Sequence, residues 1–224
     1  MQFVEKFEGE RAREYENRIG KMIPMYNGIL ELVPTLLLEL TPENGNILGV
    51  GCGTGGDFKN LIRIAPERFR ITGIDPSPEM IEQAKSKFPG IRFFADTVDK
   101  LPSNELYHSI TLLFVLHFLP DDGSKLTLLK DIYSHLKEGG NLILFDLYNS
   151  YKDEKIQFAH AASYLRNFQG WKEDNLRIYL ERVSQLHRIS GNRYLELLQE
   201  AGFIENRQIF QCLHVGGWLA TKRV

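Results

Sequence analysis

The chain has 224 residues, of which 43% are hydrophobic and 25% are charged, so it carries enough apolar side chains for one large core and does not fit a disordered class. Its formal charge is −2, which argues against a general basic surface for nucleic acids. Cys52 and Cys212 are too few for a disulfide scaffold or a four-cysteine zinc site. Apolar runs are too short to span a membrane. We expect a cytoplasmic protein without a metal, either monomer or homodimer.

The first segment, residues 1–43, is predicted to be helical. Apolar residues recur at three- and four-residue spacing from Phe3 to Met22, which is typical of an amphipathic helix. A second apolar helix is expected over residues 26–40, with Pro34 as a kink. We interpret this segment as a helical lid.

Residues 44–150 alternate short apolar runs with longer amphipathic ones. The runs predict strands over residues 47–50, 69–74, 91–94, 110–115 and 142–147, and helices over residues 57–65, 77–88 and 125–137. Ser77 is the expected N-cap of the second of these helices, and Gly139 closes the third. Strands that are apolar throughout favour a parallel sheet covered on both faces by helices, in an α/β core.

The last third of the chain changes this rhythm. Residues 151–190 are rich in aromatic side chains and are predicted to form a helical insertion over the active site. Residues 191–224 return to the core with a helix closed by Gly202 and two strands, 203–210 and 217–221, expected to be antiparallel.

Glycines cluster after the first predicted strand, in the segment ILGVGCGTGGD over residues 47–57. Glycine lets the backbone turn sharply and approach a ligand where a side chain would collide. Gly51, Gly53 and Gly56 also match the G-x-G-x-x-G spacing of dinucleotide-binding proteins, so a nicotinamide-dependent oxidoreductase remains an alternative. A tight turn without a ligand is the other interpretation.

Two acidic residues follow the next two predicted strands. Asp75 stands where a carboxylate can accept hydrogen bonds from both hydroxyls of a ribose, although an acid near a helix N-terminus can also simply stabilise the helix. Asp96 follows Phe94 and stands where it can receive an adenine amino group, with a solvated loop acid as the alternative.

The segments ILGVGCGTGG, GIDPSPEMIEQAK, FFADTVDKLP, SITLLFVLHFL and LKEGGNLILFD occur in this order over residues 47–146. In order and spacing they resemble the class I S-adenosylmethionine-dependent methyltransferases. The resemblance implies a Rossmann-like seven-stranded sheet of order 3-2-1-4-5-7-6 with an antiparallel last strand, and S-adenosyl-L-methionine as the cofactor. It also implies cofactor-binding roles for Gly51, Cys52 and Gly53 at the methionine part, Asp75 and Pro76 at the ribose, Asp96 and Thr97 at the adenine, and Leu113 and Phe114 at the methionine end.

A narrower resemblance, to the tRNA wobble-uridine carboxymethyltransferases, rests on the segments around Met25-Tyr26-Asn27 and Phe210-Gln211-Cys212. It implies that Tyr26 touches the cofactor. That group uses an arginine to bind the carboxylate of its modified cofactor, and here the position is Leu197, so ordinary S-adenosylmethionine is favoured. The wider family usually carries an acid where this chain has Gly49.

Catalytic candidates are His117, three residues after Phe114, and Tyr15 on the N-terminal helix. A general base is needed only if the acceptor loses a proton during attack. His117 is also well explained as a packed, hydrogen-bonded side chain, and Tyr15 as a core aromatic. Weaker candidates are Tyr148 and His160. The aromatic residues Phe158, Tyr164, Phe168 and Trp171 either line a substrate pocket or form core.

The favoured function is methyl transfer from S-adenosylmethionine to a small molecule. A tRNA acceptor is the first alternative, supported by 8 basic against 5 acidic residues over 151–193. A nonenzymatic domain that binds the cofactor is the second.

Overall fold

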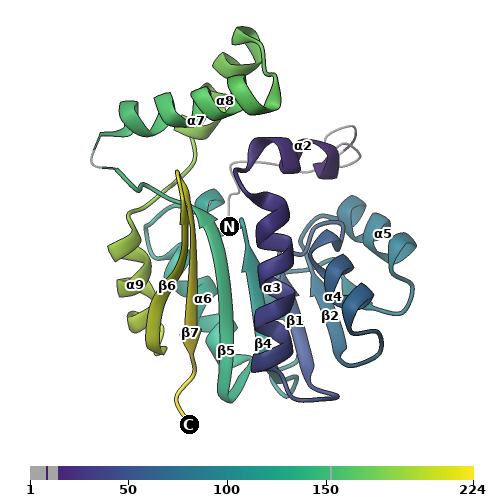
Figure 1. Cartoon of the computed structure of the whole chain (residues 1–224). Coiled ribbons are helices and arrows are strands. Elements are labelled where there is room, and N and C mark those ends of the chain that lie inside the picture. The colour runs from purple at the N-terminus through teal and green to yellow at the C-terminus, as the bar shows by residue number, and fades with distance from the viewer. Residues whose placement is uncertain (1–8, 10–14, 152) are drawn as a thin grey trace.

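The computed structural model describes residue 9, residues 15–151 and residues 153–224. Its strands form one seven-stranded sheet in the order β3-β2-β1-β4-β5-β7-β6 (Figure 1). The strands are β1 (Asn46–Val50), β2 (Arg70–Ile74), β3 (Arg92–Phe94), β4 (Tyr107–Leu113), β5 (Leu136–Leu147), β6 (Ile204–Cys212) and β7 (Val215–Thr221). The first five pair in parallel, and β7 runs antiparallel to both β5 and β6. The predicted strand order is confirmed.

Helices cover both faces of the sheet because successive strand residues point to opposite sides. On one face, α3 (Tyr26–Leu40) and α4 (Lys59–Ile64) pack against alternate residues such as Ile47 and Ile143. On the other, α6 (Ser124–Ser134) and α9 (Gly191–Glu200) pack against Leu48, Leu142 and their neighbours. α5 (Pro78–Lys87) covers the β3 edge. Ser77 caps α5, with the Met80 N–H donating to its hydroxyl at 3.3 Å.

A helical layer lies beyond the carboxyl ends of the parallel strands (Figure 1). It consists of α7 (Glu154–Gln169) and α8 (Glu173–Ser184), so the predicted helical character of this part of the chain is confirmed. Leu165, Leu176 and Tyr179 form a small core of their own, against which Met22 of α2 (Tyr15–Met22) packs. The layer and α2 therefore cover the same edge of the sheet.

The largest difference from the predicted elements lies between α6 and β5. The helix ends at Ser134 instead of residue 137, and the strand begins at Leu136 instead of residue 142. Gly139 does not cap the helix, because it already lies in the strand, where its N–H donates to Lys222 O at 3.2 Å. The strand begins this early because Leu136 pairs with Tyr107 of β4. The side chain of Leu136 is fully buried, which stabilises this pairing.

Other boundaries move by a few residues. The expected helix over 57–65 divides into a 3₁₀ turn, η1 (Gly56–Phe58), and α4, while β4 begins at Tyr107 instead of residue 110. Pro34 lies inside α3 without ending it. The predicted start of the first helix, with Phe3, lies outside the described residues. Within the described part of the chain, every helix is too short or too polar to cross a membrane.

Candidate active site

The turn after β1 has a backbone that glycine alone adopts without strain. Gly51 has a φ of +66° and Gly53 a φ of +53°, both in the left-handed region. A Cβ at Gly51 would lie 2.4 Å from the Cγ2 of Val115, so the turn passes too close to the segment after β4 for a side chain. The N–H groups of Gly51 and Cys52 both donate to Ile74 O, at 2.8 and 3.1 Å, which ties the turn to the end of β2.

Asp75 follows β2 and is joined to this turn. Its Oδ2 accepts the Gly53 N–H at 2.9 Å, and its Oδ1 accepts the Ser77 N–H at 2.9 Å. Burial raises the pKa of the Asp75 carboxyl, and the two backbone hydrogen bonds oppose that shift. Each carboxylate oxygen accepts more than one hydrogen bond, so the group keeps acceptor capacity for a ligand's hydroxyls.

Asp96 and Thr97 lie beside Asp75, because the Asp75 N–H donates to Phe94 O at 3.2 Å. Asp96 is exposed, and its Oδ1 accepts the Thr97 N–H at 2.8 Å. Pro76, between the two carboxylates along the chain, is exposed as well. The ends of β2 and β3 therefore carry the two predicted carboxylates along one edge of the sheet.

A narrow pocket opens next to the glycine turn. Its lining includes the predicted residues Tyr26, Gly51, Cys52, Leu113 and Phe114. Gly56, the third glycine of the G-x-G-x-x-G match, also lines it, together with Thr54 and Asp57, to which sequence reasoning gave no role. The ring centroids of Tyr26 and Phe114 are 5.9 Å apart. The cavity volume is about 10 Å³, room for a single water. A larger group would enter only if the lining moved apart, and one of the lining residues, Tyr26, begins α3.

His117 lies beyond this pocket, in the 3₁₀ turn η3 (Leu116–Phe118), and is held by a buried acid. Its backbone N–H donates to Asp146 Oδ2 at 2.9 Å, and its Nδ1 pairs with Asp146 Oδ1. Asp146 also accepts from the Tyr194 hydroxyl at 2.7 Å. The side chain of His117 is 4% exposed, which favours the packed, hydrogen-bonded interpretation. Its catalytic role stays a prediction.

The other catalytic candidates are placed less centrally. Tyr15 begins α2, and its side chain lies outside the described part of the chain. Tyr148 is buried with its ring edge-on to Trp218, and its hydroxyl accepts from Gln208 at 3.4 Å. His160 is exposed on α7, where its Nδ1 lies 3.3 Å from the Tyr151 hydroxyl. Phe168 is 78% exposed and does not belong to a core.

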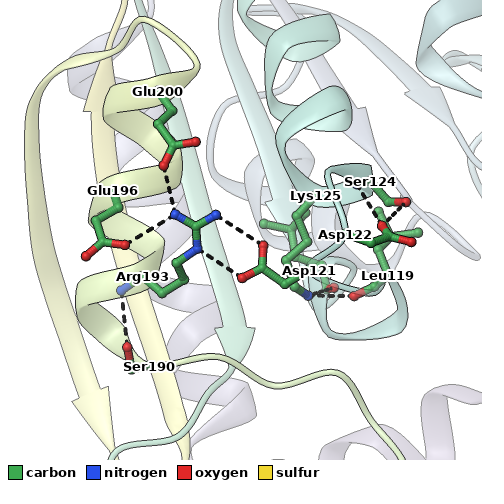
Figure 2. A network of polar contacts seen from close by, with 10 residues as sticks. Leu119, Asp121, Asp122, Ser124, Lys125, Ser190, Arg193, Glu196 and Glu200 are labelled. Carbon is green, nitrogen blue, oxygen red and sulfur yellow. Dashed lines mark hydrogen bonds and ion pairs between the residues drawn. The ribbon is translucent and has the colours of Figure 1, made fainter.

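The tRNA wobble-uridine carboxymethyltransferases bind a carboxylate with an arginine at the position of Leu197, and this chain has no unpaired arginine there among the described residues. Leu197 is fully buried in the core. Arg193, one turn earlier, binds Asp121 at 2.9 Å, Glu200 at 2.8 Å and Glu196 at 3.2 Å (Figure 2). Three carboxylates thus neutralise Arg193, so it is poorly suited to bind a further anion.

The strand order, the glycine turn after β1 and the acid after β2 define the class I methyltransferase fold. A methyltransferase-domain family model matches residues 23–204, and the chain belongs to this family. A carboxy-S-adenosyl-L-methionine synthase from Haemophilus ducreyi is 27% identical over 229 residues, covering 97% of this chain and 92% of that protein.

Solved structures share the fold. Human N-acetylserotonin methyltransferase, in complex with SAM, aligns with a TM-score of 0.65 and 23% identity over 96% of this chain and 56% of its own. The N-methyltransferase NodS from Bradyrhizobium japonicum, in complex with S-adenosyl-l-homocysteine, aligns with a TM-score of 0.60 and 19% identity over 89% of this chain and 88% of its own.

Proposed function

We propose that the protein binds S-adenosyl-L-methionine and transfers its methyl group to a small molecule. The observation that carries the proposal is the meeting of the glycine turn, Asp75 and the Tyr26–Phe114 pocket at one edge of the sheet. In open α/β sheets, ligands bind outside the carboxyl ends of the strands. The family supports the same chemistry.

The residues have distinct roles in this proposal. Gly51, Cys52 and Gly53 bring the backbone close to the methionine part, and Asp75 accepts hydrogen bonds from the ribose. Asp96 and Thr97 serve the adenine at the neighbouring strand end. Leu113 and Phe114 line the methionine end, with Tyr26 above them.

The cofactor supplies an already activated methyl group, so the protein contributes mainly by positioning the acceptor in line with it. Asp146 fixes the ring orientation of His117 and leaves its Nε2 as the nitrogen able to accept a proton. We expect this base to matter only for an acceptor that loses a proton during attack.

Calorimetric titration with S-adenosylhomocysteine tests cofactor binding. We expect the wild type to bind and Asp75→Ala to lose about 2–5 kcal/mol of binding free energy, which is thirtyfold or more in Kd, because a partly buried charged acceptor is removed. Glu43→Ala is the matched control, since Glu43 is exposed and precedes β1 at the opposite edge of the sheet. Circular dichroism of both variants checks that they fold.

Absence of binding by the folded wild type at millimolar ligand would contradict the proposal. Equal affinities of wild type and Asp75→Ala would contradict the role given to Asp75. A labelled methyl group on a metabolite fraction, with S-adenosylhomocysteine as the second product, is the expected outcome of a turnover assay.

The relatives favour a second candidate reaction, formation of carboxy-S-adenosyl-L-methionine. Against it stands Leu197, an apolar side chain where the tRNA-modifying group binds the carboxylate of that cofactor. Mass spectrometry separates the two reactions, since one adds a carboxyl group to the cofactor and the other removes its methyl group. Transfer to tRNA would instead show as RNA affinity that falls steeply with salt.

A further inference from the structure

Arg188 lies between the helical layer and the sheet, in the segment after α8. The N–H of the preceding residue, His187, donates to His117 O at 2.9 Å. Asn149, just after β5, donates through its side-chain amide to Arg188 O at 3.3 Å. These two bonds hold the backbone of residues 187 and 188 against the segments that follow β4 and β5.

The Arg188 side chain is buried, with 2% of its surface exposed. Its guanidinium lies over the Phe158 ring, with 4.8 Å between Cζ and the ring centroid, and Nη2 donates to Glu154 Oε1 at 2.9 Å. Nε and Nη1 have no hydrogen-bond partner among the described residues. A buried cation is thus paired on one side and keeps N–H donors on the others.

Such an arrangement is costly in the absence of a further acceptor. Leaving a buried donor unpaired costs about 1–3 kcal/mol, and more for a charged group. Burial lowers the pKa of Arg188, but the guanidinium remains charged near neutral pH. An anion that accepts from its free N–H groups would offset this cost with charge-assisted hydrogen bonds.

The surroundings favour a single negative charge on the ligand. Glu154, 53% exposed on its side chain, already neutralises part of the Arg188 charge. His214 lies close enough for the charge of Arg188 to affect it. Burial lowers the pKa of His214 to about 4, so His214 is neutral near pH 7. Tyr179, whose hydroxyl lies 3.1 Å from His214 Nε2, adds no charge. A monoanion suits this balance better than a doubly charged phosphate.

We propose that Arg188 binds a carboxylate of the small-molecule acceptor, so that the substrate of this enzyme is a carboxylic acid held between α7 and the sheet edge. The inference rests on the proposed methyl transfer, and it assigns Arg188 to substrate binding. The aromatic face of Phe158, already stacked on the guanidinium, would border the same substrate.

Formate is the probe, because it is the smallest carboxylate and demands no particular substrate skeleton. We expect the Nε–H resonance of Arg188, assigned by its loss in Arg188→Gln and Arg188→Lys, to shift saturably with millimolar formate at constant ionic strength. We also expect formate to raise the wild-type Tm, because a ligand that binds only the folded state stabilises it. Both variants should lose most of that rise.

Arg177→Gln is the control variant, since Arg177 is exposed on α8 and pairs with Glu181 one turn away. It should respond to formate like the wild type. A linear, nonsaturating shift, or an equal Tm rise in the Arg188 variants, would overturn the proposal and leave water as the partner of the free donors. Tighter binding of inorganic phosphate than of formate would overturn the carboxylate assignment.

The cofactor titration separates this inference from the proposed function. If formate binds at Arg188 while S-adenosylhomocysteine does not bind, the anion site stands and methyl transfer fails. If S-adenosylhomocysteine binds and formate does not, methyl transfer stands and the carboxylate site is wrong.

Discussion

At the scale of single residues, Gly49 shows how a neighbour can determine which side chains fit. The wider family usually places an acid at this position of β1. In this chain a Cβ there would lie 2.4 Å from the Phe58 ring, which is fully buried against the strand. Phe58 therefore takes the space that the acid would need, and Asp75 is left as the carboxylate joined to the glycine turn.

Gly49→Ala tests this contact. We expect a loss of about 1–3 kcal/mol in the free energy of unfolding, because the added methyl group would collide with a buried ring. Urea denaturation measures the change. Gly90→Ala is the control, since no atom lies within 4 Å of a Cβ at Gly90. A loss no larger than that of the control would show that Phe58 moves aside freely.

At the scale of secondary-structure elements, local chemistry accounts for several helix ends. Ser77 caps α5 with Pro78 following at the first helical position, as the residue types predict. At the junction of α6 and β5, strand pairing decides where the helix ends. There the strand pairing of Leu136 begins two residues after the helix ends, although the sequence up to Lys137 continues a helical pattern.

Removing the α5 cap should have a local cost. Ser77→Ala is expected to lower the free energy of unfolding by about 0.5–2 kcal/mol, because the Met80 N–H loses its acceptor. Thermal or urea unfolding provides the measurement. Ser77→Asp retains an acceptor and should recover most of the loss, whereas an Asp variant as unstable as the Ala variant would argue against a capping role.

At the scale of the whole molecule, buried polar contacts join the helical layer to the sheet. The Tyr179 hydroxyl of α8 meets His214, which stands between β6 and β7, and Arg188 joins the same region to Glu154 of α7. Because Tyr179, His214 and Arg188 are buried, their protonation is coupled to folding. The stability of the protein is therefore expected to depend on pH.

The stability of the protein should fall as the pH is lowered from about 6.5 towards 4. Burial, together with the charge of Arg188, lowers the pKa of His214 to about 4, below the value of about 6.5 in an unfolded chain. Between these values the unfolded state binds a proton that the folded state does not, so the stabilisation is complete above the higher value and is lost on acidification. The stabilisation that the lowered pKa of His214 contributes is at most about 3 kcal/mol.

Unfolding curves over this pH range for wild type and His214→Gln provide the check, with the difference in slope as the readout. We expect a flatter dependence for His214→Gln. His160→Gln, at an exposed histidine, should keep the wild-type slope. Parallel curves for wild type and His214→Gln would rule out His214 as the source.

Much of the candidate site was accessible from the sequence because its parts are local. Gly51 and Gly53 are needed wherever the chain turns with positive φ, and Asp75 follows directly from the end of a predicted strand. Asp146 was missed as the partner of His117, and Tyr194 as a second donor to Asp146. They are far apart in the chain, and an acid at the end of an apolar strand shows no sign of which histidine it will meet.

By itself, the sequence determined the alternation of strands and helices, the glycine turn and the carboxylates at the strand ends, since each depends on residues within about one turn or strand of one another. Only the tertiary structure decided where α6 ends and β5 begins, and that the Phe58 ring fills the space beside Gly49. It also decided that Arg188 is buried with two of its nitrogens, Nε and Nη1, lacking a hydrogen-bond partner among the described residues. Those outcomes depend on contacts between segments distant in the chain, and such contacts leave no periodic pattern to be found beforehand.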